Sequence, residues 1–181
     1  MLVIPTPLPG AMLIEPRLFS DHRGFFYESF NARDFEAQTG IDVRFVQDNH
    51  SLSARGVLRG LHYQLPRAQG KLVRVIRGAV LDVILDIRRS SPTFGQWFSQ
   101  VLSADNRLQL WLPPGFAHGI SVLEDATEVL YKTTDYWMPE HERTILWNDP
   151  ALGIDWQLPG EPILSDKDRC GIPLAQAEVF G

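Results

Sequence analysis

The chain has 181 residues, a net charge of −5 and one cysteine. A chain of about this length usually forms one domain, so we expect a single domain over residues 1–181. One cysteine excludes an internal disulfide, and the acidic balance argues against a surface that binds polymeric nucleic acid. No apolar run approaches the roughly 20 residues that cross a bilayer, and the first five residues do not form a secretory signal. We therefore expect a cytoplasmic protein with no membrane partner.

One segment has the pattern of a helix. Residues 31–40 begin with Asn31, a suitable N-cap, and end with Gly40, a C-terminal stop. Polar residues 47–51 follow an apolar run, and we expect a loop there. The remaining periodic segments predict strands at residues 43–46, 71–76, 79–87, 96–103, 107–112, 119–123 and 128–134.

The spacing of these short strands predicts an all-β sandwich or barrel. Strand 79–87 should place Asp82, Ile84 and Asp86 on one face and Leu81, Val83, Leu85 and Ile87 on the other. After Trp147 the chain is rich in Pro, Gly and Asp. We expect this tail to wrap the barrel as loops and short helices.

Arg59, His62 and Lys71 lie on or beside neighbouring predicted strands and could bind an anion together. Each alone is more often a structural residue. Arg59 and His62 are three positions apart, so a regular strand would point them to opposite faces. A shared cavity therefore requires a bulge or kink near Gly60.

Residues 112–119 form a Pro- and Gly-rich corner that places His118 at the start of a strand. This corner resembles a motif of the cupin barrel, which often carries metal ligands. A cupin metal site needs a second histidine where this chain has Gln64, and a glutamate follows only at Glu124. A stable site needs three or four ligands, so we predict a barrel that holds no metal.

Other polar groups have structural explanations when they are considered singly. Tyr131 could be a packed core tyrosine, and residues 165–168 an exposed charged turn. Together, however, the chain resembles the dTDP-4-dehydrorhamnose 3,5-epimerase family from about residue 16 to about residue 170. The matching segments are residues 23–28, 47–51, 56–62, 91–95, 115–119, 130–132 and 164–168.

The resemblance implies a cupin-type jelly-roll barrel, with one or a few short helices and a C-terminal tail over the barrel. It also implies a homodimer without a cofactor. The implied substrate is a dTDP-linked 4-keto-6-deoxy sugar. The implied reaction is inversion at C3 and C5 of dTDP-4-dehydro-6-deoxy-D-glucose, giving dTDP-4-dehydro-L-rhamnose in dTDP-L-rhamnose biosynthesis.

By the same resemblance, His62 matches the base and Asp168 the carboxylate paired with it. Tyr131 matches the acid on the opposite face of the sugar, and Lys71 the residue near the keto oxygen. Trp137 matches an aromatic position that can stack on thymine. The remaining substrate-contacting positions are Arg23, Glu28, Gln47, Asp48, Asn49, Arg59, His118, Glu142 and Lys167.

These residue types suit the reaction, because inverting a C–H bond beside a ketone needs a base on one face and an acid on the other. Three alternatives remain: a related epimerase that inverts one carbon, a nucleotide-sugar-binding barrel without catalysis, and a metal-dependent cupin oxygenase. The acid–base set of His62, Asp168 and Tyr131 argues against the binding protein. The missing ligand pattern argues against the oxygenase.

Overall fold

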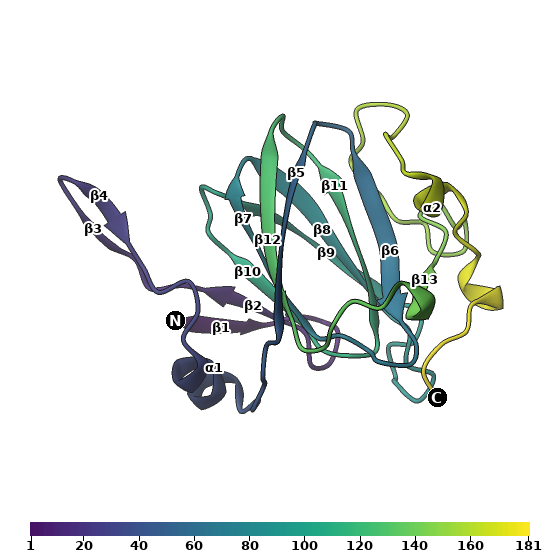
Figure 1. Cartoon of the computed structure of the whole chain (residues 1–181), viewed down its shortest axis with the longest axis horizontal. Coiled ribbons are helices and arrows are strands. Elements are labelled where there is room, and N and C mark those ends of the chain that lie inside the picture. Colours follow the sequence, from purple (N-terminus) through teal and green to yellow (C-terminus); the bar gives the residue numbers. More distant parts are fainter.

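Short strands with alternating apolar residues form two antiparallel sheets that face each other (Figure 1). The computed structural model describes residues 1–181. The predicted all-β, cupin-type jelly roll is confirmed, although its two main sheets are not hydrogen-bonded to each other and do not form one closed barrel. None of the helices combines the length and the apolar character needed to cross a membrane.

Within both sheets the order of the strands in space differs from their order along the chain. From edge to edge, the six-stranded sheet contains β1 (Leu2–Pro5), β2 (Met12–Glu15), β10 (Gln109–Leu112), β7 (Lys71–Arg77), β12 (Thr127–Thr133) and β5 (Gln47–Ser53). The five-stranded sheet contains β13 (Glu142–Thr144), β6 (Leu58–Gln64), β11 (Phe116–Val122), β8 (Ala79–Asp86) and β9 (Trp97–Ser103). The other elements are the hairpin β3 (Phe19–Asp21) and β4 (Gly24–Phe26), the α-helices α1 (Ala32–Thr39) and α2 (Asp166–Arg169), and the 3₁₀ turns η1 (Pro139–His141) and η2 (Leu174–Gln176).

Strand β8 is buried along its whole length because both of its faces are covered. Val80 and Ile84 pack in the core between the two sheets. Leu81, Val83 and Leu85 face the other way, into a second core that the C-terminal tail completes. The predicted division of this strand into two faces is confirmed, as is the prediction that the tail wraps the β core.

Helix α1 has the predicted ends. Asn31 accepts a hydrogen bond from the backbone of Asp34, and Gly40 closes the helix in the left-handed conformation. Its buried Phe35 packs edge-on against Trp111, with ring centroids 5.5 Å apart. The helix thereby covers part of the outer face of the six-stranded sheet.

The prediction of a strand at residues 43–46 and a loop at residues 47–51 is wrong. Residues 43–46 form no strand, and the polar residues open β5, which pairs with β12 along its whole length. The side chains of Gln47, Asn49 and Ser51 line a cavity between the sheets. A polar cavity, unlike an apolar core, places polar side chains on the inner face of a strand, so apolar periodicity could not reveal β5.

The β3–β4 hairpin projects from the body of the molecule (Figure 1). Phe19, Phe25 and Phe26 are 50%, 56% and 67% exposed. Three exposed aromatic side chains on one small hairpin form an apolar surface that a monomer rarely leaves in water.

Candidate active site

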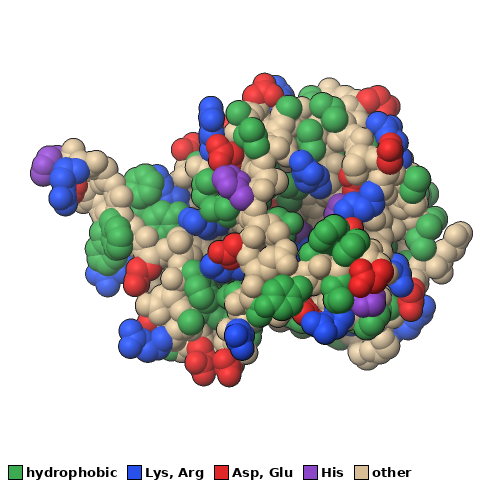
Figure 2. Space-filling model, viewed as in Figure 1, with side chains coloured by type: hydrophobic (Ala, Val, Ile, Leu, Met, Phe, Trp, Pro, Cys, Tyr) green, Lys and Arg blue, Asp and Glu red, His purple; other side chains and the backbone are tan.

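A cavity of about 340 Å³ opens between the two sheets, and Figure 2 shows histidine and basic side chains around a hollow on this face. It brings together residues from β5, β6, β7, β11, β12, β13 and the C-terminal tail. The sequence-predicted residues that line it are Gln47, Asn49, Arg59, His62, Lys71, His118, Tyr131, Trp137, Glu142 and Lys167.

His62 and Asp168 form a pair at the wall of this cavity. The ring Nε2 of His62 lies 2.7 Å from Oδ1 of Asp168, which is buried. Burial lowers the pKa of His62 more than Asp168 raises it, so the imidazole is neutral at neutral pH. Although burial acts to raise it, hydrogen bonds from His62, Ser165 and Gly60 hold the pKa of Asp168 well below its usual range. The carboxylate is therefore ionised and orients the ring.

Helix α2 delivers Asp168 to a residue 106 positions away in the sequence. Ser165 is the N-cap and Asp168 the N3 residue of a capping box, with both reciprocal hydrogen bonds present. The second oxygen of Asp168 accepts the Ser165 hydroxyl, and Oδ1 also accepts the backbone N–H of Gly60 at 3.0 Å. The cap thus fixes the carboxylate against β6.

An irregularity in β6 lets Arg59 and His62 face one cavity, as the sequence required. His118 of β11 pairs with His62, whereas Ile120, two residues on, pairs with Arg59, three residues back. The extra residue in β6 shifts the alternation of side chains. Gly60 lies at this point with a φ of +118°, and a Cβ there would be 2.5 Å from the Cα of Gly119. Only glycine fits this approach of two backbones.

Lys71 and Tyr131 supply the other reactive groups. Desolvation lowers the pKa of Lys71 to about 8, although the carboxylates of Glu142 and Asp82 raise it. At neutral pH the amine still carries its charge. Burial raises the pKa of Tyr131 despite the opposing charge of Arg59, so its phenol keeps its proton. The cavity therefore holds a neutral base, a cation and a weak acid.

Polar contacts order the rim of the cavity. Lys167 lies 2.9 Å from Glu142, which joins the tail to β13. The side-chain oxygen of Gln47 accepts the backbone N–H of Trp137 at 3.1 Å. Trp137 lines the cavity and is 55% exposed, so its side chain is accessible to a ligand.

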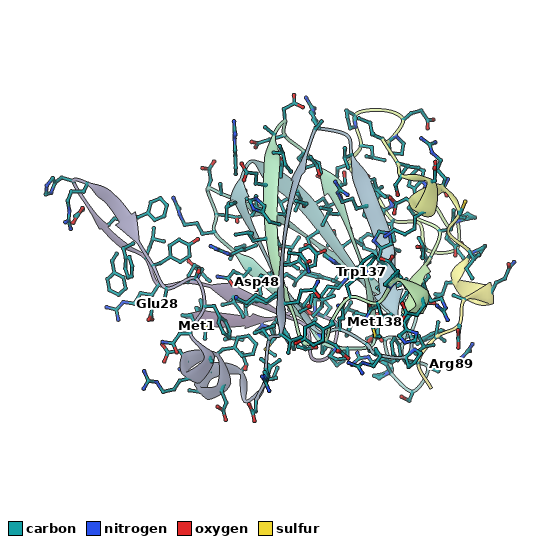
Figure 3. The ribbon with its side chains drawn as sticks, in the orientation of Figure 1. Met1, Glu28, Asp48, Arg89, Trp137 and Met138 are labelled. Carbon is teal, nitrogen blue, oxygen red and sulfur yellow. The ribbon has the colours of Figure 1, made fainter.

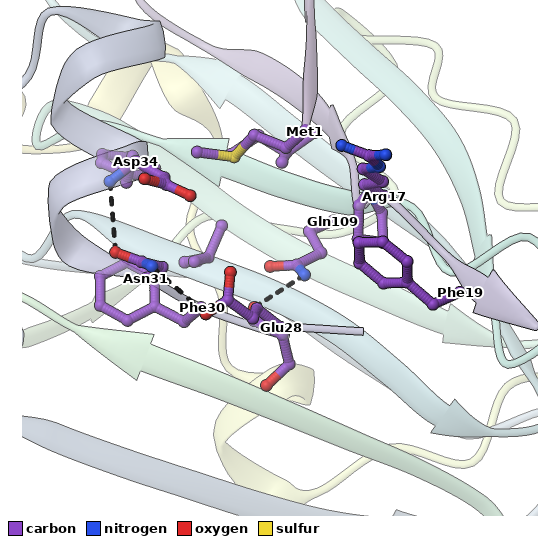
Figure 4. A pocket seen from close by; sticks show the side chains of 13 residues that line it. Met1, Arg17, Phe19, Glu28, Phe30, Asn31, Asp34 and Gln109 are labelled. Atoms are coloured by element: carbon purple, nitrogen blue, oxygen red, sulfur yellow. Dashed lines mark hydrogen bonds between the residues drawn. The ribbon is translucent and has the colours of Figure 1, made fainter. Parts of the chain in front are cut away.

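Three predicted substrate contacts lie outside this cavity within the single chain. Asp48 points to the outer face of β5, where it pairs with Lys132 at 3.0 Å. Glu28 lines a separate cavity of about 230 Å³ beside α1 (Figure 4), and Figure 3 places it at the base of the hairpin, away from Trp137. Arg23 lies on the hairpin and pairs with Asp21. All three stay predictions.

Sequence reasoning did not assign Ser51, Gln69 or Asp82 to the site. Ser51 and Gln69 line the cavity, and the buried carboxylate of Asp82 contacts the ring of His118. The signal for Asp82 was present, because it is a charged residue inside an apolar strand. No group of three or more His, Cys, Asp or Glu side chains is arranged to hold a metal ion. The residues that line the site offer acid–base chemistry and cationic binding groups.

Comparison with known proteins agrees with this geometry. The family model described as dTDP-4-dehydrorhamnose 3,5-epimerase matches residues 5–176. A protein of that name from Pseudomonas aeruginosa is 61% identical over 173 residues, which cover 96% of each chain.

Two solved structures share the fold. The dTDP-6-deoxy-D-glucose-3,5-epimerase of Legionella pneumophila, in complex with dTDP-4-keto-L-rhamnose, is 50% identical with a TM-score of 0.95, over 98% of this chain and 94% of that one. A 3'-monoepimerase of Streptomyces bikiniensis, in complex with dTDP-quinovose, is 37% identical with a TM-score of 0.91, over 96% and 88%. The match to the family model and the identity over the whole chain show that this protein belongs to the dTDP-4-dehydrorhamnose 3,5-epimerase family.

Proposed function

We propose that this protein is an isomerase that inverts C3 and C5 of dTDP-4-dehydro-6-deoxy-D-glucose and so forms dTDP-4-dehydro-L-rhamnose for dTDP-L-rhamnose biosynthesis. The observation that carries the proposal is the gathering of His62, Lys71 and Tyr131 in one cavity, with Asp168 bound to His62. Membership of the family supports the same substrate and reaction.

His62 is the base in this proposal. Its Nε2 is held by Asp168, so Nδ1 is the nitrogen left to accept a proton from the carbon beside the ketone. The C–H bond breaks, its electrons form the carbon–carbon double bond of an enolate, and negative charge collects on O4. Asp168 then stabilises the imidazolium that forms.

Lys71 and Tyr131 complete the inversion. The Lys71 ammonium stabilises the enolate oxygen, a contribution of about 3 kcal/mol for one well-placed donor. Tyr131 gives its phenolic proton to the same carbon from the opposite face, and exchange with solvent then restores Tyr131 and His62. The two proton transfers repeat at the second carbon.

The rest of the cavity suits the nucleotide. Arg59 and Lys167 provide cations for the pyrophosphate, and the exposed ring of Trp137 can stack on thymine. These few cations act locally, which reconciles anion binding with a net charge of −5.

Turnover in deuterated water tests the proposal. We expect the wild type to incorporate deuterium at C3 and C5, and His62→Ala and Tyr131→Phe each to lose about 10²- to 10⁴-fold in rate, the usual contribution of one acid or base. NMR of the sugar product reports both positions. Tyr136→Phe is the matched control, because Tyr136 is 57% exposed and does not line the cavity. Unchanged exchange in both site variants would contradict the mechanism.

The same experiment separates the related alternative. The relative from Streptomyces bikiniensis is a 3'-monoepimerase, and the groups proposed here could serve inversion of a single carbon. Deuterium at both carbons, with the L-configured product, supports the double inversion. Deuterium at one carbon supports the monoepimerase.

We further propose a cytoplasmic homodimer of single-domain subunits. The exposed aromatic face of the β3–β4 hairpin supports a partner, because a second copy would cover it. Arg23 lies on this hairpin, outside the cavity of its own chain, so the hairpin would carry Arg23 to the site of the other subunit. The one cysteine, free and exposed, suits a reducing compartment.

A further inference from the structure

A second histidine–aspartate pair lies on the floor of the cavity. The ring Nε2 of His118 is 2.9 Å from Oδ1 of Asp82. His118 of β11 is the register partner of His62 on β6, and both rings line the same cavity. Two imidazoles, each held through Nε2 by a buried carboxylate, therefore lie side by side on neighbouring strands.

The side chain of Asp82 accepts fewer hydrogen bonds than that of Asp168. Its side chain has no exposed surface, its only hydrogen bond is to His118, and its Oδ2 is buried without a partner. It shares the inner face of β8 with Val80 and Ile84, which pack in the apolar core. Burial of a carboxylate in such a setting costs desolvation free energy, which a single hydrogen bond repays only in part. Its presence is better explained by the histidine that it holds.

The contact also determines which ring nitrogen faces the cavity. A neutral His118 ring that donates its Nε2–H to Asp82 carries no proton on Nδ1, and Nδ1 forms no hydrogen bond within the protein. His118 keeps 10% of its side-chain surface exposed, and it lines the cavity. An unprotonated Nδ1 there is an acceptor that suits a sugar hydroxyl.

The charge of Asp82 has a second effect. Together with Glu142, it raises the pKa of Lys71, which desolvation holds at about 8. Losing Asp82 would therefore leave less of Lys71 protonated at neutral pH. The other titratable groups facing this cavity are Arg59, His62, His118, Tyr131, Glu142 and Lys167.

We propose that Asp82 is a positioning residue for the epimerisation, which holds His118 as the Nε2–H tautomer so that Nδ1 accepts a hydrogen bond from a hydroxyl of the sugar. Asp82 itself cannot touch the substrate, because its side chain is fully buried. The inference rests on the proposed function, and it adds a residue and a role to the site.

Two substitutions separate orientation from charge. Asp82→Asn keeps an oxygen that can accept the His118 N–H but loses the charge, whereas Asp82→Ala loses both. We expect kcat/KM of Asp82→Ala to fall about 10²-fold, the scale of a misplaced group in a catalytic site, and Asp82→Asn to recover much of that loss. In both variants the alkaline limb of the pH profile should move to lower pH, because Lys71 loses a neighbouring negative charge.

Nitrogen-15 NMR of the histidine rings reads the tautomer directly, with the His118 signals assigned by His118→Gln. We expect the Nε2–H form in the wild type and in Asp82→Asn, and its loss in Asp82→Ala. An Nδ1–H form in the wild type overturns the inference.

Asp86→Asn is the matched control for burial. Asp86 lies on the same face of β8 and is equally buried, but Arg88, Ser91 and Thr93 satisfy it and it does not line the cavity. Asp86→Asn should lower the melting temperature and leave kcat/KM within twofold of the wild type. A calorimetric titration with dTDP shows that each variant is folded.

The outcomes also separate the inference from the proposed function. Normal wild-type exchange together with a fully active Asp82→Ala overturns the inference alone. A wild type that incorporates no deuterium contradicts the proposed function, and the inference falls with it.

Discussion

Ser165 shows how a residue far from the reacting atoms controls the base. Its hydroxyl binds the second oxygen of Asp168 while also capping α2. Without this hydroxyl, Oδ1 of Asp168 still accepts hydrogen bonds from His62 and Gly60. Oδ2 retains only the 3.4 Å contact to the backbone N–H of Ser165. The carboxylate would then be free to rotate, and the imidazole with it.

We therefore predict that Ser165→Ala lowers kcat with little change in KM, by about 10-fold, the lower end of the range for a hydrogen bond to a charged group. The lost cap should also reduce the free energy of unfolding by about 1 kcal/mol. Ser165→Thr keeps the hydroxyl and should behave as the wild type in both measurements. Equal kcat in the wild type and Ser165→Ala would show that α2 alone positions Asp168.

The pH dependence follows from His62 and Lys71. The base works unprotonated, and burial lowers its pKa below the ordinary 6.5, so activity should persist below pH 6.5. Lys71 works as a cation, so activity should fall as the pH rises through its pKa of about 8. We expect a bell-shaped profile of kcat/KM with these two limbs. A Lys71→Arg variant that keeps any activity should lose the alkaline limb near pH 8, because arginine stays charged.

At the scale of the strands, the close approach of β6 and β11 builds the cavity wall. The irregular pairing around Gly60 turns Arg59 and His62 to the same side. A methyl group at Gly60 would collide with the backbone of Gly119 rather than with a flexible side chain. The two strands could then keep neither their spacing nor their register.

We predict that Gly60→Ala lowers the free energy of unfolding by about 3 kcal/mol or more, since overpacking and positive-φ strain act together. Gly153→Ala is the control, because Gly153 also has positive φ but no atom lies within 4 Å of its added Cβ. Its cost should be about 1 kcal/mol, from backbone strain alone. Denaturant unfolding measures both, and equal losses would mean that the strands can separate to admit the methyl group.

At the scale of the whole molecule, the hairpin and the cavity lie apart in one chain. Figure 1 shows β3–β4 projecting beyond the sheets, and Arg23 lies between these two strands. A subunit whose hairpin enters its partner's site would make each site depend on both chains. That arrangement can be tested with two defective variants.

We predict that Arg23→Ala and His62→Ala homodimers are each defective and that mixing equal amounts, after subunit exchange, restores about a quarter of wild-type turnover. Random exchange makes half of the dimers mixed, and each mixed dimer has one site with both residues intact. Mixing His62→Ala with Tyr131→Phe is the control in which no hairpin residue is changed. If the Arg23→Ala mixture shows no recovery, Arg23 does not act across the subunit boundary.

The all-β class, the ends of α1 and the two faces of β8 could be predicted from the sequence. These features depend on local periodicity and on capping residues, which act within a few positions. The sequence also required an irregularity near Gly60, because two residues three apart had to share a cavity. The sequence pattern did not predict β5, because the polar side chains that face the cavity do not alternate with apolar ones.

Which of the predicted residues contact one another depends on the folded chain and could not be predicted from local patterns. His62 and Asp168 are 106 positions apart in the sequence. Their contact depends on the tail folding over β6 and on the cap formed by Ser165. A charged residue inside an apolar strand marked Asp82 in the sequence, but only the structure showed that it contacts the ring of His118. Such contacts join distant parts of the chain, so packing and register, rather than local pattern, determine them.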